Sequence, residues 1–209
     1  DYTRTCQCSY QNQTSLALIH MTELEYWTTN DWAWNGKPIK NVGINLNAPG
    51  DRMAEDGTLW LDFPSVGGQS PDIPITFDTL QVNWVRRHSS TLDGNGEKWI
   101  AASGVEGPFT MDVTVSAEPL SEATFTVHLH FAELLDKKPS ERVFDVYIQG
   151  EKVLDSFDIA REAGGANRPV VKSIQGVKAR DKVTIKCLPG ETSPDSKPLL
   201  CGVQLKRDI

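Results

Sequence analysis

The chain has 209 residues, 39% of them hydrophobic and 23% charged, which is the balance of an ordinary globular protein with one large or two small domains. This composition excludes disordered and collagen-like chains. With 28 acidic and 21 basic residues the net charge is −7, the wrong sign for a protein that gains affinity by neutralising phosphates, so no nucleic-acid partner is expected. The apolar runs are far shorter than the roughly 20 residues that cross a bilayer, so no membrane partner is expected either.

Residues 1–38 differ in composition from the rest of the chain. They are polar and Gln-rich, and they hold two closely spaced cysteines and three clustered tryptophans. We interpret them as a lead segment that packs on a domain formed by residues 39–209, or as the tail of a preceding domain. The chain starts at Asp1 without an export leader, which is expected of a mature or excised piece. The residues concerned are Cys6, Cys8, Trp27, Trp32 and Trp34.

Strand signals dominate from about residue 40 onward. Short β-branched or aromatic runs are separated by Gly, Pro, Asn and Asp clusters, which is the rhythm of a β-sandwich. The alternation is clearest in 124–131, where Phe125, Val127, Leu129 and Phe131 should face the core. Helical signal is limited to 22–28 and 160–163. The predicted fold class is therefore all-β, with strands expected at 42–46, 58–63, 109–115, 124–131, 143–148, 152–159, 170–177 and 183–187.

Two cysteines flank the last predicted loop. Cys187 ends one strand-like run and Cys201 begins the next, with a Pro/Gly/Ser-rich stretch between them. An antiparallel hairpin would bring the two sulfurs together, and a disulfide there would contribute about 3 kcal/mol in an oxidising compartment. The alternative is two buried free thiols. Cys6 and Cys8 would lie on the same side of a strand and rarely bridge each other, so their partners are expected outside this chain.

Several segments resemble the malectin and malectin-like family of carbohydrate-binding sandwiches. The sequence FTVHLHFAE of 125–133 is followed by RVFDVYIQG of 142–150 and by FDI of 157–159, in the order of the family's central strands. The ending PLLCGVQL of 198–205 is similar to the family's last strand, and GIN of 43–45 with WLD of 60–62 to its opening. The resemblance spans about residues 40–207. It implies a jelly-roll type antiparallel β-sandwich that binds carbohydrate.

The first 18 residues resemble the end of a β-propeller in exported bacterial proteins that carry PQQ-binding-like repeats and a C-terminal malectin-like domain. This second resemblance implies an upstream domain of the same parent protein as a partner. It also implies an extracytoplasmic location, in the periplasm, on the cell surface or secreted, and an upstream partner for Cys6 or Cys8.

The resemblance implies loop aromatics as sugar contacts. The C–H groups of a sugar ring pack on a π-surface, while its hydroxyl groups need a few fixed polar partners. Trp99, beside the glycine-rich turn 93–96, is the leading exposed candidate, whereas Trp60 and Trp84 fit a core strand as well as a binding loop. Asp195 matches the aspartate that holds the disaccharide in animal malectin, but no tyrosine of this chain matches a family site tyrosine. The predicted ligand-binding residues are Trp60, Phe63, Trp84, His88, Trp99 and Asp195.

Other chemistry-bearing groups favour structural roles. His128, His130 and Glu133 could form a metal trio, since alternate strand residues share a face, but satisfying buried polar groups is the favoured interpretation. No cofactor is predicted. Structural calcium at 51–57, or at Asp93 and Asn95, is the alternative to solvated turns. The basic spot at 86–88 is interpreted as a solvated strand end.

No catalytic constellation is present in the sequence. The favoured hypothesis is a non-catalytic carbohydrate-binding module. The alternative is a structural or interaction domain that docks on an upstream β-propeller through the tryptophan-rich lead, and the third is an enzyme fragment that cleaves a glycan. An exposed tryptophan patch in the lead would favour docking, whereas an aromatic-lined hollow among the loops would favour sugar binding.

Overall fold

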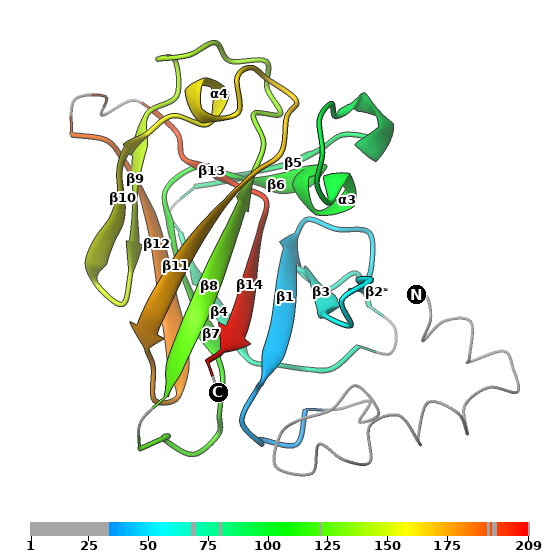
Figure 1. Cartoon of the computed structure of the whole chain (residues 1–209), viewed down its shortest axis with the longest axis vertical. Coiled ribbons are helices and arrows are strands. Elements are labelled where there is room, and N and C mark those ends of the chain that lie inside the picture. Colours follow the sequence, from blue (N-terminus) through cyan, green and yellow to red (C-terminus); the bar gives the residue numbers. More distant parts are fainter. Residues whose placement is uncertain are drawn as a thin grey trace, which may run out of the picture.

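The computed structural model describes residues 34–67, 70–79, 81–121, 123–191, 193 and 196–208. Two large β-sheets pack face to face, and a third, small sheet lies at one end of them together with short helices (Figure 1). The predicted all-β class is confirmed. Among the described residues, no helix is long and apolar enough to cross a bilayer. The division between 1–38 and 39–209 stays a prediction, because residues 1–33 lie outside the described part of the chain.

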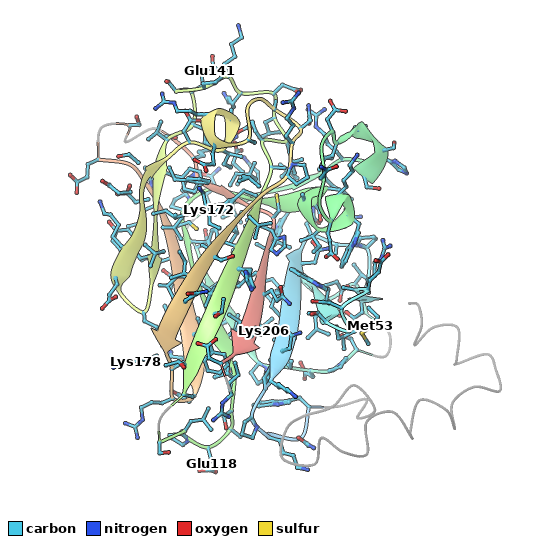
Figure 2. The ribbon with its side chains drawn as sticks, viewed as in Figure 1. Met53, Glu118, Glu141, Lys172, Lys178 and Lys206 are labelled. Atoms are coloured by element: carbon cyan, nitrogen blue, oxygen red, sulfur yellow. The ribbon has the colours of Figure 1, made fainter. Side chains whose placement is uncertain are left out.

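The first sheet has six strands in the order β11-β8-β14-β1-β3-β2. Neighbouring strands are antiparallel except β1 and β3, which run parallel with Gly43 opposite Trp60. Labelled side chains show the direction of the strands, since Lys178 of β11 and Lys206 of β14 lie at the same end of the sheet (Figure 2). The six strands are β1 (Asn41–Leu46), β2 (Arg52–Met53), β3 (Leu59–Phe63), β8 (Thr124–Phe131), β11 (Val170–Lys178) and β14 (Gly202–Arg207).

The second sheet has five antiparallel strands in the order β10-β9-β12-β7-β4. The third has the order β13-β6-β5. The remaining elements are the helices η1 (Ser89–Thr91), α3 (Lys98–Ala101) and α4 (Ile159–Glu162). The strands of these two sheets are β4 (Ile75–Asp78), β5 (Asn83–Arg86), β6 (Ser103–Glu106), β7 (Phe109–Thr114), β9 (Phe144–Ile148), β10 (Glu151–Phe157), β12 (Lys182–Pro189) and β13 (Leu199–Leu200).

The core lies between the two large sheets. β8 supplies one side with the four apolar residues predicted for it, each of them 0% exposed. Met111 and Val113 of β7 and Val183 and Ile185 of β12 are equally buried in the same cluster. Burying a side chain of this size stabilises the fold by about 1.5–3 kcal/mol. The alternation of apolar and polar residues therefore determines which face of each sheet packs in the core and which is exposed to solvent.

Most of the predicted strands are confirmed, but four short ones escaped prediction: β2, with two residues, and β4, β5 and β6. β4 alternates only over Ile75 and Phe77, which is too short a run to stand out, and the four residues of β5 and of β6 show no alternation. β6 has the sequence SGVE and is nevertheless buried throughout, as the central strand between β13 and β5. The helical turn predicted at 160–163 is confirmed as α4, whereas the one predicted at 22–28 lies outside the described residues.

The predicted disulfide between Cys187 and Cys201 is wrong, since both residues are free buried thiols. Their strands do not form a hairpin. β12 pairs with β7 and β9 in the second sheet, whereas Cys201 directly precedes β14 of the first sheet. The stretch between them therefore crosses from one layer of the sandwich to the other. Burial raises the pKa of the Cys201 thiol to about 12, so it stays protonated.

Candidate functional site

A pocket of about 640 Å³ lies between the loop after β1, the start of η1 and α3. Figure 1 shows α3 near the end of β1. Its walls come from three segments: the loop after β1 (48–52), the end of β5 with the start of η1 (86–89), and α3 with the start of β6 (99 and 102–103). Asn45 of β1 closes the base. Two of the predicted ligand-binding residues, His88 and Trp99, are brought together here.

The guanidinium of Arg52 lies over the ring of Trp99. The guanidinium carbon of Arg52 lies 4.6 Å from the centre of the Trp99 ring, a cation–π contact. Behind this ring stands Trp60, whose ring meets that of Trp99 edge to face with centroids 5.8 Å apart. Arg52 and the half-buried Trp99 both line the pocket.

Trp60 is placed inside the protein, with 2% of its surface exposed, so it offers no open face to a ligand. Its ring lies directly over Gly43 of the neighbouring strand, where an added Cβ would come 2.1 Å from Cδ2 of the indole. Gly202 of β14 leaves room for the far edge of the same ring. Gly43 and Gly202, which lack side chains, thus leave the space that the Trp60 ring occupies, and Trp60 in turn packs against Trp99.

Two further arginines of the pocket are held in place by hydrogen bonds. Arg86 donates from Nε to the backbone oxygen of Asn47, 2.8 Å away. Arg87 donates from Nε to the backbone oxygen of Leu134, and its Nη2 lies 2.6 Å from a carboxylate oxygen of Asp136. Successive residues at a strand end point to opposite sides, and each guanidinium is anchored to a different loop.

The remaining polar groups of the pocket are small. His88 caps η1, and its Nδ1 lies 2.7 Å from the hydroxyl of Ser90. Asn45 and Ser103 are both buried and joined by a hydrogen bond of 3.4 Å from the serine hydroxyl to Asn45 Oδ1. Neutral hydroxyl and amide groups of this kind are suitable partners for the hydroxyl groups of a ligand.

Asp51 of the pocket wall forms a pair with Asp62, a residue of β3 that does not itself line the pocket. Asp62 is 6% exposed, and one of its oxygens accepts a 2.8 Å hydrogen bond from the backbone N–H of Val66. Burial, reinforced by the neighbouring Asp51, raises the pKa of Asp62 to about 6. Asp51 also accepts a hydrogen bond from the backbone N–H of Asp62, at 3.0 Å. The pair connects the pocket to β3.

We expect Asp62→Asn to stabilise the domain at neutral pH. A carboxyl group with a raised folded-state pKa favours the folded state below its unfolded pKa of about 3.9, and this contribution is lost as the pH rises through about 6. The variant should equal the wild type near pH 4 and exceed it by about 1–2 kcal/mol at pH 7. Urea denaturation at several pH values measures this. A difference that does not grow between pH 4 and pH 7 would show that Asp62 titrates normally.

Phe63 and Trp84 form a separate aromatic group outside the pocket. Their ring centroids are 6.3 Å apart, and both contact Phe77, which stacks on Phe109 at 4.9 Å. Trp84 is 38% exposed, so it offers a face to solvent. Asp195, the sixth predicted ligand-binding residue, lies outside the described residues, as do Trp27 and Trp32. The sequence therefore placed two of its six candidates in the pocket.

The pocket is also lined by three arginines, Arg52, Arg86 and Arg87, which were not among the predicted ligand-binding residues. The basic spot at 86–88 was the available signal, but it was interpreted as a solvated strand end. Arg52 gave no signal, because it meets Trp99 only after the loop 47–52 and α3 come together in space. In the loop 51–57, where calcium was the alternative to a solvated turn, Asp51 and Asp56 accept hydrogen bonds from backbone N–H groups. Among the described residues no three His, Cys, Asp or Glu side chains gather into a metal site.

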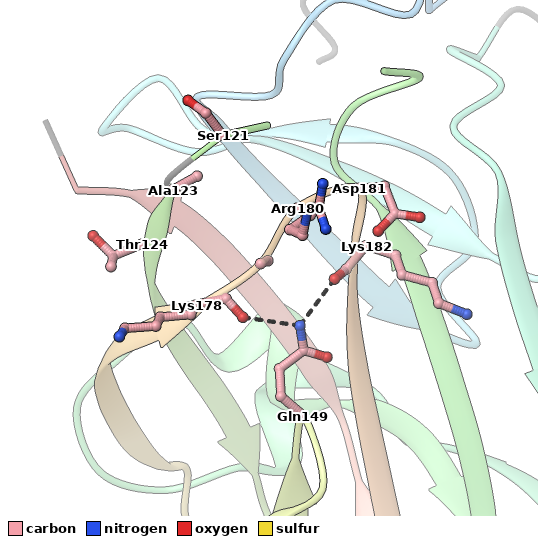
Figure 3. A pocket seen from close by; sticks show the side chains of 9 residues that line it. Ser121, Ala123, Thr124, Gln149, Lys178, Arg180, Asp181 and Lys182 are labelled. Atoms are coloured by element: carbon pink, nitrogen blue, oxygen red, sulfur yellow. Dashed lines mark hydrogen bonds between the residues drawn. The ribbon is translucent and has the colours of Figure 1, made fainter. Parts of the chain in front are cut away.

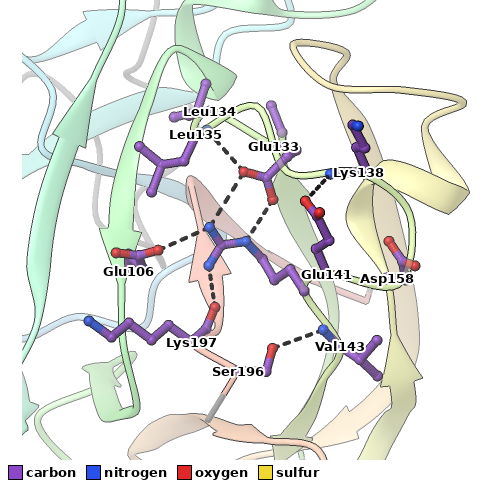
Figure 4. A network of polar contacts seen from close by, with 12 residues as sticks. Glu106, Glu133, Leu134, Leu135, Lys138, Glu141, Val143, Asp158, Ser196 and Lys197 are labelled. Atoms are coloured by element: carbon purple, nitrogen blue, oxygen red, sulfur yellow. Dashed lines mark hydrogen bonds and ion pairs between the residues drawn. The ribbon is translucent and has the colours of Figure 1, made fainter. Parts of the chain in front are cut away.

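Glu133 belongs to a buried ionic network instead of a metal trio (Figure 4). Arg142 Nε lies 2.6 Å from Glu133, and its Nη2 lies 3.0 Å from Glu106 of β6. His128 is paired with Ser173 through its Nδ1 at 2.7 Å, whereas the ring of His130 packs edge-on against Trp60 at 5.0 Å. Burial, with a smaller effect of His128, lowers the pKa of His130 to about 4, so this ring is neutral.

A second pocket, of about 720 Å³, lies at the opposite end of the sandwich (Figure 3). Lys178 of its lining pairs with Thr124 at the start of β8, whereas the first pocket lies near the far end of that strand. The amide of Gln149 donates to the backbone oxygens of Lys178 and Lys182 at 3.0 and 3.1 Å. None of the described residues that line this hollow is aromatic, so they offer no surface on which a sugar ring packs.

Residues 116–193 match the family model of the Malectin domain. This confirms the predicted malectin resemblance for that stretch, which runs from the end of β7 to the loop before β13. The chain is 34% identical over 159 residues to a probable LRR receptor-like serine/threonine-protein kinase (At1g53430) of Arabidopsis thaliana, covering 66% of this chain and 15% of that protein. A probable leucine-rich repeat receptor-like kinase (At3g14840) of the same plant is 32% identical over 82 residues, 36% of this chain and 8% of the relative.

The fold is shared with solved structures of low sequence identity. The ANX1 ectodomain from Arabidopsis thaliana superimposes with a TM-score of 0.62 at 15% identity, over 80% of this chain and 48% of that one. A β-glucuronidase of Bacteroides uniformis gives 0.59 at 12% identity, over 81% of this chain and 18% of that enzyme. These likenesses concern the fold alone. The two sequence relatives, At1g53430 and At3g14840, are probable plant receptor-like kinases and give no support to the predicted bacterial propeller context.

Proposed function

We propose that the chain is a non-catalytic carbohydrate-binding domain and that the sugar occupies the pocket between the loop 47–52, the end of β5 and α3. One observation carries the proposal: an aromatic ring with a guanidinium stacked on it lines a pocket at the loop end of the sandwich. The match of residues 116–193 to the Malectin domain supports it. In this proposal the pocket binds the sugar without cleaving it.

The chemistry of the walls suits a sugar. The flat surface made by Arg52 and Trp99 packs against the C–H groups of a pyranose ring, and the indole edge contributes apolar area. His88 and Ser103 then stand close to the ring hydroxyl groups, where they donate or accept hydrogen bonds. A pocket with a few fixed polar groups around one aromatic wall is a common form of ligand site.

We infer that the domain lies outside the cell as a part of a longer protein, on the pattern of the receptor-like kinases. The chain spans only 15% of the length of its relative At1g53430, and the ANX1 structure is described as an ectodomain. In such a protein the sugar would bind to this domain at the cell surface, and other domains of the protein would transmit the signal.

Trp99→Ala is expected to weaken sugar binding at least tenfold, because it removes the aromatic wall and releases Arg52 from its stack. The measurement is a glycan-array screen of the purified chain followed by calorimetric titration with any glycan that binds. Trp84→Ala is the matched control, since it removes the same kind of ring outside the pocket. Equal loss in both variants would place the site elsewhere, and a chain that binds no glycan would overturn the proposal.

A second candidate is an interaction domain that contacts another part of its parent protein. The observation in its favour is the 38% exposed ring of Trp84 above Phe63 and Phe77. An upstream propeller would be one such neighbour, and leucine-rich repeats, which the names of the relatives contain, would be another. In the screen described above, this function predicts that no glycan binds.

A further inference from the structure

We propose that the carboxyl pair of Asp51 and Asp62 is a pH-dependent switch, which holds the loop 48–51 against β3 in acid and releases it near neutral pH. This loop forms one wall of the pocket described above, so the switch changes the shape of that wall. The proposal does not depend on what the pocket binds.

The loop 48–51 is attached to β3 through the side chain of Asp51. Both ends of the loop are fixed, since the N–H of Asn47 donates to a backbone oxygen of β3 at 2.6 Å and Arg52 pairs with β3 in the strand ladder. Between these ends, Asp51 Oδ1 accepts the backbone N–H of Asp62 at 3.0 Å, and the two side chains are also hydrogen-bonded to each other. The attachment of the loop therefore depends on the state of two carboxyl groups.

Two carboxyl groups in hydrogen-bond contact attract each other only while they share a proton. Asp62 is 6% exposed, so the contact is shielded from water. Loss of the proton turns the contact into repulsion between two carboxylates. Burial, reinforced by Asp51, raises the pKa of Asp62 to about 6. The protonated pair therefore favours the attached loop, and this attachment is lost as the pH rises through about 6.

On the side of β3, the groups around Asp62 do not replace the proton. The loop after β3 contributes the neutral backbone N–H of Val66, which donates to Asp62 Oδ2 at 2.8 Å. The segment before β4 contributes Asp72, which lines a hollow of about 370 Å³ together with Asp62 and adds a further acidic group. Neither group neutralises an ionised Asp62.

On the side of the pocket, the cations have other partners. Three arginines and His88 line the pocket together with Asp51. Arg52 lies over an indole, Arg87 is paired with a carboxylate at 2.6 Å, and the third arginine donates to a backbone oxygen. Their charge favours the ionised form of Asp51, so the proton of the pair resides on Asp62.

Release of the loop reshapes the pocket. Gly50 and Asp51 both line it, and the next residue, Arg52, carries the guanidinium that lies over the ring of Trp99. A shift of Asp51 away from β3 therefore also disturbs the contact between Arg52 and Trp99. We expect the wall to be rigid below about pH 6 and mobile above it.

The test is a nitrogen-15 NMR titration of the full 209-residue chain between about pH 4.5 and pH 8. The amide signals of Asp62 and Val66 and the indole N–H signal of Trp99 should shift with a common midpoint near pH 6. A chemical shift responds to charge as well as to movement, so mobility is the second readout. The order parameters of Gly50 and Asp51 should fall from about 0.85 in acid to below about 0.6 at neutral pH.

Two variants alter the switch in different ways. Asp62→Asn removes the titrating group and keeps its shape, so the signals of Val66 and Trp99 should stay at their acid positions and the loop should stay rigid at neutral pH. Asp51→Asn keeps an acceptor for the backbone N–H of Asp62 and removes the neighbouring charge, so the midpoint should move to lower pH. Histidine titrates in the same range, so His88→Gln is the control and should leave the midpoint and the loop mobility unchanged.

A midpoint near pH 6 at Val66 without any change of mobility at Gly50 and Asp51 would overturn the switch, since Asp62 would then titrate beside a fixed loop. The absence of a transition at Val66 would overturn it as well, and so would a transition that persists in Asp62→Asn. These outcomes leave the proposed sugar site untouched, because the titration contains no glycan.

Discussion

Replacing Arg142 by methionine is expected to lower the free energy of unfolding by about 3–5 kcal/mol, the cost of leaving buried charges without their partner. Arg142 is 2% exposed, and its guanidinium contacts Glu133, which is 0% exposed, and Glu106, which is 8% exposed. It also donates to the backbone oxygen of Lys197. Methionine keeps most of the volume, so the loss reports the charge and the hydrogen bonds. Urea denaturation monitored by circular dichroism measures it.

A matched surface variant separates this effect from the loss of any arginine. Arg161→Met removes a guanidinium whose side chain is 67% exposed and lies 3.6 Å from Asp158, and it should cost less than about 1 kcal/mol. Adding Glu133→Gln to Arg142→Met should recover part of the loss, because one buried charge is then neutralised. An Arg142→Met variant no less stable than Arg161→Met would contradict the structural role of the network.

The same network shows what the sequence can and cannot indicate. Glu133 and Arg142 both fall in segments that carry the malectin resemblance, so their importance could be read from the sequence, but their partnership could not. Glu106 gave no signal, because it belongs to β6, a four-residue strand without alternation. Asn83 of β5 donates to Glu106 at 3.0 Å, which ties a second unpredicted strand to the network. Tertiary pairing, not local pattern, defines these elements.

The strands with long alternation were predictable, as in β8, where bounds and core residues agree with the structure. The wrong disulfide has the opposite cause. A strand, a turn-rich loop and a strand are typical of a hairpin, but the local pattern carries no information on which sheet the second strand joins. Cys187 lies in a strand of the second sheet, whereas Cys201 precedes β14, which joins the first sheet. The sheet that β14 joins is set by its pairing with β1 and β8.

The pocket was predictable only in part for a similar reason. His88 and Trp99 carried an aromatic or turn signal, and the structure brings them together with Arg52. These three residues come from separate segments, Arg52 from β2, His88 from the start of η1 and Trp99 from α3. The burial of Trp60, in contrast, follows from Gly43 and Gly202, which leave a gap on the outer face of the sheet. A glycine in a strand signals close approach of another group, but the sequence does not say which group.

Gly43→Ala is expected to destabilise the domain by about 3 kcal/mol, because its new Cβ would come 2.1 Å from Cδ2 of Trp60, far inside van der Waals contact. Gly43 lies in the middle of β1 between β14 and β3, so neither backbone can move away without disturbing a ladder. Trp60, 2% exposed beneath Ile100 and Trp99, has no free volume to enter. Thermal and urea denaturation measure the change.

The comparison variant is Gly190→Ala, where a Cβ would meet nothing closer than 3.3 Å, and its cost should stay below about 1 kcal/mol. A double-mutant cycle with Trp60→Leu should show a coupling of at least about 1 kcal/mol, since the smaller side chain relieves the clash. Trp99 rests on Trp60, so Gly43→Ala should also weaken sugar binding while the domain remains folded. If Gly43→Ala lowered the stability but left sugar binding unchanged, the positions of Trp99 and Arg52 would not depend on the packing of Trp60 against Gly43.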